Sequence, residues 1–154
     1  MEKKLTSIDY ARLIQYAAQK FHRQMLNKTQ INKILFAVYG HYFAMYGTPL
    51  FDNEVPRAWP YGPVFPTVNK RINIDEVVNF TQDKIDMFVN NRDAQQIVVD
   101  MVNRMYDKSA QALTEWSHQY GSPWYRTVYP AEGGHAKWNT PIPLEYIKEY
   151  FSQN

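Results

Sequence analysis

Few residues of this chain have the types and spacing that catalysis requires. The 154-residue sequence contains no cysteine, which excludes a thiol nucleophile, a disulfide and a thiolate zinc site. Its histidines stand singly, and none has the HExxH or similar spacing that brings metal ligands together on one helix face. They are His22, His41, His118 and His135. The sequence therefore predicts no metal site and no cofactor.

Two further arrangements resemble catalytic motifs without meeting their requirements. Ser117 and His118 are neighbours, but adjacency alone does not give the geometry of a catalytic triad, and no GxSxG turn is present. Glu132-Gly133-Gly134 lacks the preceding strand and the following Lys-Ser/Thr of a phosphate-binding loop. We therefore expect a protein that acts by binding and is not an enzyme.

Charge and hydropathy limit the kinds of partner. The formal net charge of +2 is too small to indicate nucleic-acid binding by itself. The helices expected on either side of Asn27-Lys28-Thr29 imitate a helix-turn-helix, but the second is too apolar to present a polar face to base edges. There is no signal-peptide pattern and no run approaching the roughly 18 apolar residues that span a bilayer. We expect a cytoplasmic protein that binds neither DNA directly nor membranes.

Apolar residues at three- and four-residue spacing predict the first two helices. One should begin at a Thr6 or Ser7 cap and end near Leu26-Asn27, and the next should run from a Thr29 cap to a stop at Gly47. The second is apolar nearly all round, so we expect it at the centre of the domain.

The rest of the chain predicts shorter elements. Five prolines between residues 48 and 66 exclude a long helix, so this segment should be extended, with room for a short edge strand, before a helix at 66–71. Residues 72–91 fit either helix or strand. Further helices are expected at 92–106, from Ser109 to before Gly121, and from Pro143 to Phe151, with a loop through Pro130 between the last two. The pattern predicts a mostly α fold, a single domain over residues 1–154 with about six or seven helices.

Several blocks of sequence resemble one known family, the Panacea domain (also called GepA-like or SocA-like). Residues 31–42, INKILFAVYGHY, are similar to its Lys-Leu-Leu-Tyr-Tyr-like helix. PLFD at 49–52 and AWPYGPVFP at 58–66 resemble its AWxYGPVxP signature. ALTEWSH at 112–118, followed by Pro123-Trp124, resembles its helix that ends in a histidine before Gly-Pro-Trp. The closing segment 142–151 resembles the usual terminal helix of the family.

This resemblance implies an antitoxin of a bacterial or phage toxin–antitoxin pair, which neutralises its toxin by direct protein–protein binding. The partners that it implies are toxins of diverse kinds, among them small-alarmone synthetases and other blockers of translation. Two alternatives remain open. The chain could be an adaptor that delivers a toxin or another client to an AAA+ protease, or it could be a phage regulatory protein.

The resemblance also selects candidate site residues. The motif residues, which serve either as scaffold or in partner binding, are Trp59, Tyr61, Gly62, Pro63, Pro66, His118, Pro123 and Trp124. If members with a shared motif bind different toxins, the selective contacts should lie outside it, in stretches such as 72–92 and 125–139. Large side chains anchor protein interfaces, so the candidate partner-binding residues are Tyr125, Arg126, Tyr129 and Trp138.

Overall fold

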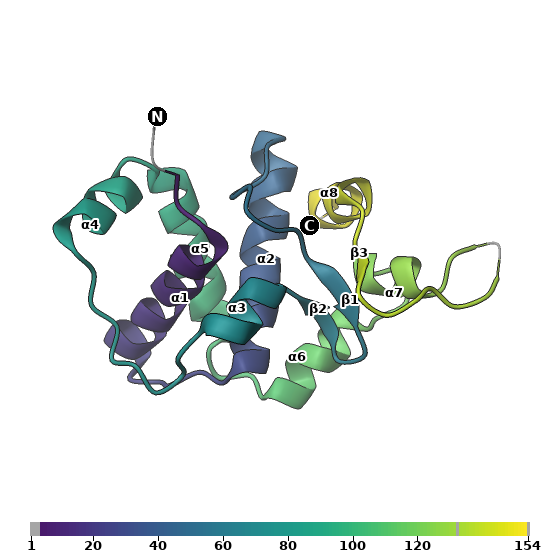
Figure 1. Ribbon diagram of the computed structural model, residues 1–154, viewed down its shortest axis with the longest axis horizontal. Coiled ribbons are helices and arrows are strands. Elements are labelled where there is room, and N and C mark those ends of the chain that lie inside the picture. Colours follow the sequence, from purple (N-terminus) through teal and green to yellow (C-terminus); the bar gives the residue numbers. More distant parts are fainter. Residues whose placement is uncertain (1–3, 132, 154) are drawn as a thin grey trace.

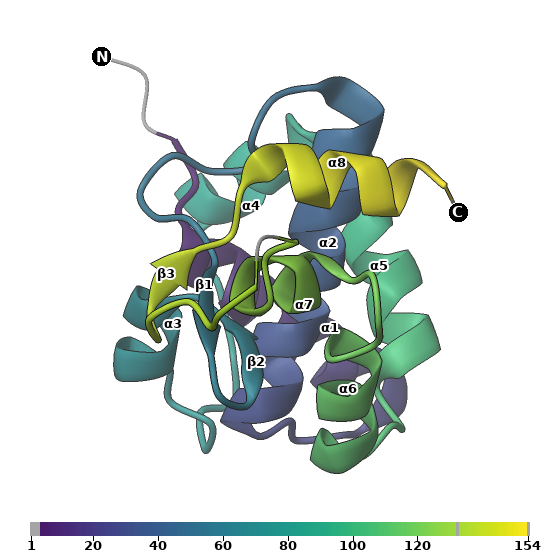
Figure 2. The same ribbon diagram turned by 90° about the vertical axis from the view of Figure 1, so that its right-hand side faces the viewer.

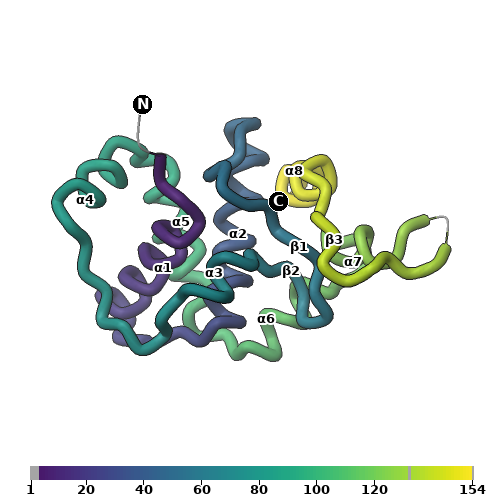
Figure 3. Tube along the Cα trace, viewed as in Figure 1, coloured from purple at the N-terminus to yellow at the C-terminus, as the bar shows by residue number. Residues whose placement is uncertain are grey.

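The computed structural model of the chain describes residues 4–131 and 133–153, which form eight helices and three short strands. The helices are α1 (Ser7–His22), α2 (Lys28–Tyr46), α3 (Pro66–Arg71), α4 (Gln82–Val89), α5 (Arg92–Met105), α6 (Ala110–Ser117), α7 (Pro123–Val128) and α8 (Leu144–Ser152). The strands are β1 (Arg57–Trp59), β2 (Gly62–Val64) and β3 (Thr140–Pro141). Figures 1 and 3 show α2 near the middle of the molecule, with α1, α4 and α5 on one side and α7 and α8 on the other. The mostly α fold predicted from the sequence is confirmed.

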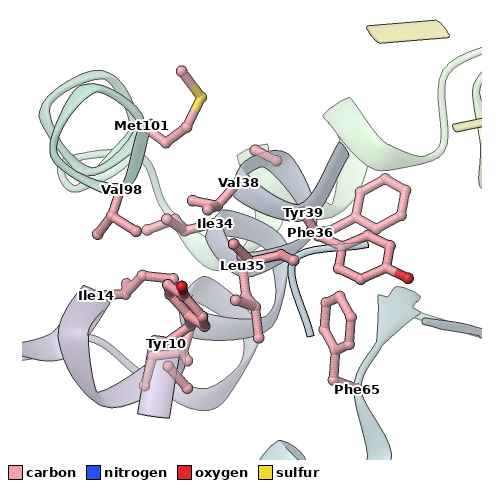
Figure 4. Packing of buried hydrophobic residues seen from close by; sticks show 14 of the residues in the cluster. Tyr10, Ile14, Ile34, Leu35, Phe36, Val38, Tyr39, Phe65, Val98 and Met101 are labelled. Carbon is pink, nitrogen blue, oxygen red and sulfur yellow. The ribbon is translucent and has the colours of Figure 1, made fainter. Parts of the chain in front are cut away.

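Helix α2 is the centre of the core, as its all-round apolar surface predicts. Every residue from Gln30 to Gly40 is buried, and the helix contacts α1, α5, α6 and α8. In Figure 4, Ile34 of this helix lies between Ile14 of α1 and Val98 of α5, and Leu35 extends between Tyr10 and Phe65. A helix that buries so much of its circumference fixes the positions of all the elements that pack around it.

The connection between α1 and α2 corrects two predictions. Helix α1 ends at His22, earlier than Leu26-Asn27, because Arg23 adopts a left-handed conformation with φ 53° and closes the last turn. The N-cap of α2 is Asn27 and not Thr29. The Asn27 side chain accepts a hydrogen bond from the Gln30 amide (2.8 Å), and the Gln30 side chain accepts one from the Asn27 amide (2.9 Å). This reciprocal pair satisfies two amides that the start of a helix leaves without intrahelical partners.

The proline-rich segment forms a β-hairpin, which the sequence predicts only as one optional strand. Strands β1 and β2 are antiparallel with Trp59 opposite Gly62, so Pro60 and Tyr61 form the turn. Strand β3, which the sequence did not predict, pairs with the other edge of β1 and gives the order β2-β1-β3. Pro66 begins α3, as predicted.

Two short helices lie in segments where the sequence does not define a helical period. In one segment the apolar spacing is ambiguous, and the other is too short. Helix α4 occupies residues 82–89 of the stretch that fitted both helix and strand, and Thr81 caps it. Helix α7 was not predicted. It has a Ser122 cap and Pro123 in its first turn, but six residues are too few to establish a helical period.

Candidate protein-binding site

The motif residues come together where the hairpin meets α2, α6 and α7. We call this contact region the hairpin junction, and its members are Lys33, Gly62, Pro63, Ser117, His118 and Trp124. Figure 1 shows the hairpin between α2 and α7, and Figure 2 shows α7 below α8. The Ser122 hydroxyl donates a hydrogen bond to the Ser117 carbonyl (2.8 Å) and caps α7, so the chain reverses between α6 and α7 and returns toward the hairpin.

Trp124 links three elements of the hairpin junction. Its indole Nε1 donates a hydrogen bond to the Trp59 carbonyl of β1 (2.7 Å). Its ring stacks on His118 at the end of α6, with centroids 3.8 Å apart and an interplanar angle of 15°. The structure therefore brings together Trp59, His118 and Trp124, which the sequence selected from two separate blocks.

Gly62 permits the close approach of the hairpin to α2 and α6. Its φ is +116°, a value that side chains disfavour. A Cβ atom at this position would lie 2.5 Å from the Ser117 hydroxyl oxygen and 2.8 Å from Cε of Lys33. Both the backbone conformation and the available space therefore require glycine.

Lys33 is a buried cation directly beneath the hairpin. It is 3% exposed, and Nζ donates a hydrogen bond to the Pro63 carbonyl at 3.1 Å, its one such partner among residues 4–131 and 133–153. Burial lowers the pKa of Lys33 to about 8, because the interior solvates the ammonium poorly. The pKa of His118 is lowered as well, first by burial and then by Lys33, while the Pro60 carbonyl opposes the shift. His118 therefore stacks on Trp124 as a neutral ring near pH 7.

Sequence reasoning missed the polar residues of α2 that hold the hairpin. Asn32 Oδ1 accepts a hydrogen bond from the Phe65 amide (2.9 Å), one helical position before Lys33. The sequence did contain a signal for these contacts. Asn32 and Lys33 are adjacent polar residues in a helix, and the next six residues, Ile34 to Tyr39, are an unbroken apolar or aromatic run. Buried polar side chains normally have a specific partner, so this pair indicated contacts to another element.

Asn139 fastens the segment after α7 to the hairpin. Its side-chain oxygen accepts a hydrogen bond from Trp59 Nε1 (3.0 Å), and its carbonyl accepts one from Arg57 Nη1 (2.7 Å). Its φ is 71°, a left-handed value that asparagine tolerates better than most residues. These contacts fix the end of the loop between α7 and β3, which projects from the body in Figures 1 and 3.

A continuous set of aromatic rings covers the outer side of α7 and this loop. We call it the aromatic surface, and its members are Tyr120, Tyr125, Tyr129, His135 and Trp138. Successive centroids are 5.1, 5.0, 5.4 and 4.6 Å apart, and Trp138 also lies 6.5 Å from the ring of Trp124. Tyr120 is 89% exposed, Tyr129 45% and Trp138 46%. Rings that contact one another while remaining exposed form a preorganised surface of the kind that anchors protein partners.

The predicted site residues therefore fall into two groups. Among the motif residues, Gly62, Pro63, Pro123 and Trp124 are buried, Trp59, Pro66 and His118 are half-buried, and Tyr61 is 75% exposed. Among the candidate partner-binding residues, Tyr129 and Trp138 are exposed and Tyr125 is half-buried. Arg126 faces α8, where it pairs with Glu149 (2.8 Å) and lies 3.9 Å over the Tyr146 ring. Sequence reasoning missed Tyr120, whose position beside Gly121 at a helix end was the available signal.

Within the described part of the chain, no three His, Cys, Asp or Glu side chains lie close enough together to hold a metal ion. No helix formed by residues 4–131 and 133–153 has the length and apolar character needed to cross a membrane.

Comparison with known proteins identifies the family of the region that contains the hairpin junction. Residues 31–125 match the family model described as "Antitoxin SocA-like, Panacea domain". The match covers more than half of the chain and extends from α2 into α7. It confirms the family resemblance that the sequence blocks indicate. No curated protein and no solved structure matches the chain.

Proposed function

The chain belongs to the Panacea-domain family of SocA-like antitoxins, and we propose on this basis that it neutralises a toxin by binding it directly. Neutralisation by binding is stoichiometric, because one antitoxin molecule occupies one toxin molecule and no bond is made or broken. The family match is the single observation that carries this proposal. The geometry adds a candidate contact surface.

The aromatic surface supports the proposal through its composition and exposure. Tyrosine and tryptophan supply a large contact area with few rotatable bonds, so fixing them in a complex costs little conformational entropy. Because neighbouring rings already contact one another, part of this entropy cost is met before a partner arrives. We therefore assign the toxin-binding site to this surface.

The position of this surface relative to the family match supports a division of roles. Three of the five members of the aromatic surface, Tyr129, His135 and Trp138, lie beyond residue 125, the end of the matched range. The other two and all members of the hairpin junction lie within it. In this proposal the junction holds α7 in place, and the residues beyond it select the toxin. Tyr61, the one well-exposed motif residue, contributes from the hairpin turn.

The finer proposal concerns the partner and its site of action. The toxin is a cytoplasmic protein that blocks translation, with a small-alarmone synthetase as one class to test first. Its gene is proposed to lie next to that of this chain, as expected for a toxin–antitoxin pair.

A growth assay tests the proposal. The neighbouring open reading frame is induced alone and together with this chain, and growth and co-purification are measured. We expect arrest by the neighbour alone, relief on co-expression, and a complex containing equal numbers of the two proteins. Neutralisation at far below a one-to-one ratio, or conversion of a toxin product, would contradict simple binding.

A matched pair of variants tests the surface itself. Tyr120→Ser, Tyr129→Ser and Trp138→Ser are combined in one protein. A residue at an interface centre contributes about 2 kcal/mol or more, which is about 30-fold in affinity, and such losses are not additive, so the triple variant should lose at least about 100-fold. The control combines Phe21→Ser and Val77→Ser, two residues that are 57% and 74% exposed and lie outside the aromatic surface. If both proteins rescue growth equally, the toxin binds elsewhere.

If the chain is instead an adaptor, the amount of toxin in the cell should depend on an AAA+ protease. An adaptor lowers the amount of toxin only in cells that contain its AAA+ protease, whereas a direct inhibitor protects protease-deficient cells equally well. Measuring toxin levels and growth in both backgrounds separates the two mechanisms.

A further inference from the structure

A pocket of about 410 Å³ lies among α2, α5, α6 and α8 and shares no lining residue with the aromatic surface. Its apolar lining includes Met105, Leu113, Trp116 and Phe151. Its volume is within the range of roughly 300–1,000 Å³ that is usual for small-molecule sites, which are mainly apolar with a few polar groups. α5 and the C-terminal end of α8 lie on the same side of the molecule in Figure 2.

Apart from the Tyr150 hydroxyl and the Trp116 indole N–H, the polar side chains at this pocket are basic. Arg104 and Lys108 are exposed, and the side chain of neither forms a hydrogen bond or ion pair with any residue of 4–131 or 133–153. No aspartate or glutamate lines the pocket. His41 is the third basic residue, and its pKa is lowered by burial and then by Arg104. The pocket therefore presents two cations for which residues 4–131 and 133–153 supply no anionic partner.

We propose that this pocket binds a small organic carboxylate with an apolar body. The apolar part lies against Met105, Trp116 and Phe151, and the carboxylate faces Arg104 and Lys108. Guanidinium and ammonium groups form charge-assisted hydrogen bonds with carboxylates, and a guanidinium can do so through two parallel bonds. Burial of the apolar body supplies most of the affinity, and the cations select the anionic head group.

Three probes with the same alkyl chain and different head groups test the charge selectivity. Decanoate, decanol and decyltrimethylammonium are titrated into the full chain by calorimetry, below their micelle-forming concentrations. We expect decanoate to bind at a single site, decanol to bind about tenfold more weakly, and the cation not to bind detectably. Equal binding of all three, or several decanoate molecules bound per chain, would overturn the proposal.

Charge-removing variants test the location. Arg104→Gln and Lys108→Gln should each weaken decanoate binding about threefold and together about tenfold, the range expected for solvent-exposed charge pairs. Arg92→Gln is the matched control, since this exposed arginine begins α5 and lies at the opposite end of that helix from Arg104. Decanoate affinity that is unchanged in the double variant, or lowered equally by the control, would overturn the assignment to this pocket. Because the readout is binding of a small molecule, it is independent of toxin neutralisation.

Discussion

Trp124 contacts two regions of opposite character, the hairpin junction, to which it belongs, and the aromatic surface. In the junction, His118 stacks on the ring, Lys33 is almost completely buried, and a glycine is required by backbone and space together. On the aromatic surface, Trp138 lies 6.5 Å from the same ring and remains half exposed. The comparison shows that most of the motif residues are buried or half-buried at contacts between elements, whereas most rings of the neighbouring aromatic surface are exposed.

The largest expected effect on stability comes from Gly62, which belongs to the hairpin junction. Gly62→Ala places a methyl group against Ser117 and Lys33 at an unfavourable φ, so the free energy of unfolding should fall by about 2–4 kcal/mol. Gly121→Ala is the control, because Gly121 also has a positive φ of +82° but no atom within 4 Å of the added Cβ. In the control, the free energy of unfolding should fall by only about 1 kcal/mol, the cost of placing an alanine at a positive φ. Urea unfolding of both variants measures the difference, and equal losses would show that the junction is not tightly packed.

Lys33 makes the stability of the junction depend on pH. The pKa of Lys33 is lowered from 10.5 to about 8 in the folded chain, so between these values the unfolded chain holds a proton that the folded chain has released. The free energy of unfolding should therefore rise as pH increases, by about 2 kcal/mol from pH 7 to 9.5. Lys33→Met should abolish this rise, whereas Lys70→Met, at an exposed position of α3, should keep it.

The pH range of the Lys33 experiment is limited to 9.5 because buried tyrosines lower the free energy of unfolding at higher pH. Burial raises the pKa of Tyr10 and Tyr39 to about 12, so each stabilises the fold less as pH rises above 10. Measurements up to pH 9.5 keep this contribution small, and it is common to the wild type and both lysine variants. A rise that persists in Lys33→Met would show that another group is responsible.

The same substitution at Trp124 and at Trp138 compares how much each region contributes to the free energy of unfolding. Trp124→Phe removes the donor to the Trp59 carbonyl and reduces the stack on His118, so the free energy of unfolding should fall by about 1–2 kcal/mol. Trp138→Phe, at a half-exposed ring, should change it by less than about 0.5 kcal/mol. Thermal or urea unfolding provides the measurement. Similar losses in both variants would mean that the aromatic surface is part of the scaffold.

The hairpin junction also shows what could be predicted from the sequence and what could not. The long helix α2 was predictable, because an apolar run of that length has a clear period and a glycine stop. Its exact start was not, because Asn27 and Thr29 are both good caps and only the reciprocal bonds with Gln30 distinguish them. Short elements such as α7 and β3 depend on tertiary contacts, among them the bond from Trp124 to the Trp59 carbonyl, and local sequence does not encode these contacts.

For the candidate site, the sequence indicated which types of side chain to select, but not which of them contact other elements in the folded chain. Tyr129 and Trp138 were selected as large side chains outside the motif, and both are exposed. Arg126 was selected on the same grounds, but it is engaged with Glu149 and Tyr146 because α8 returns beside α7. For Lys33, two adjacent polar residues in an apolar helix indicated a specific partner, but the sequence does not identify that partner as a hairpin carbonyl thirty residues later.

A smaller loss of stability than at Gly62 or Lys33 is expected at Asn139, which joins the segment before β3 to β1. Asn139→Ala loses the acceptor for Trp59 Nε1 and places a methyl side chain at φ 71°, so the free energy of unfolding should fall by about 1 kcal/mol. Asn139→Gly loses the same acceptor without the cost of the left-handed conformation, so its loss should be about half as large. If toxin affinity falls in both variants while unfolding changes this little, the fastening serves mainly to orient Trp138 and its neighbours. If the affinity is unchanged, the loop before β3 presents its rings without help from β1, and the aromatic surface is independent of the scaffold that the family shares.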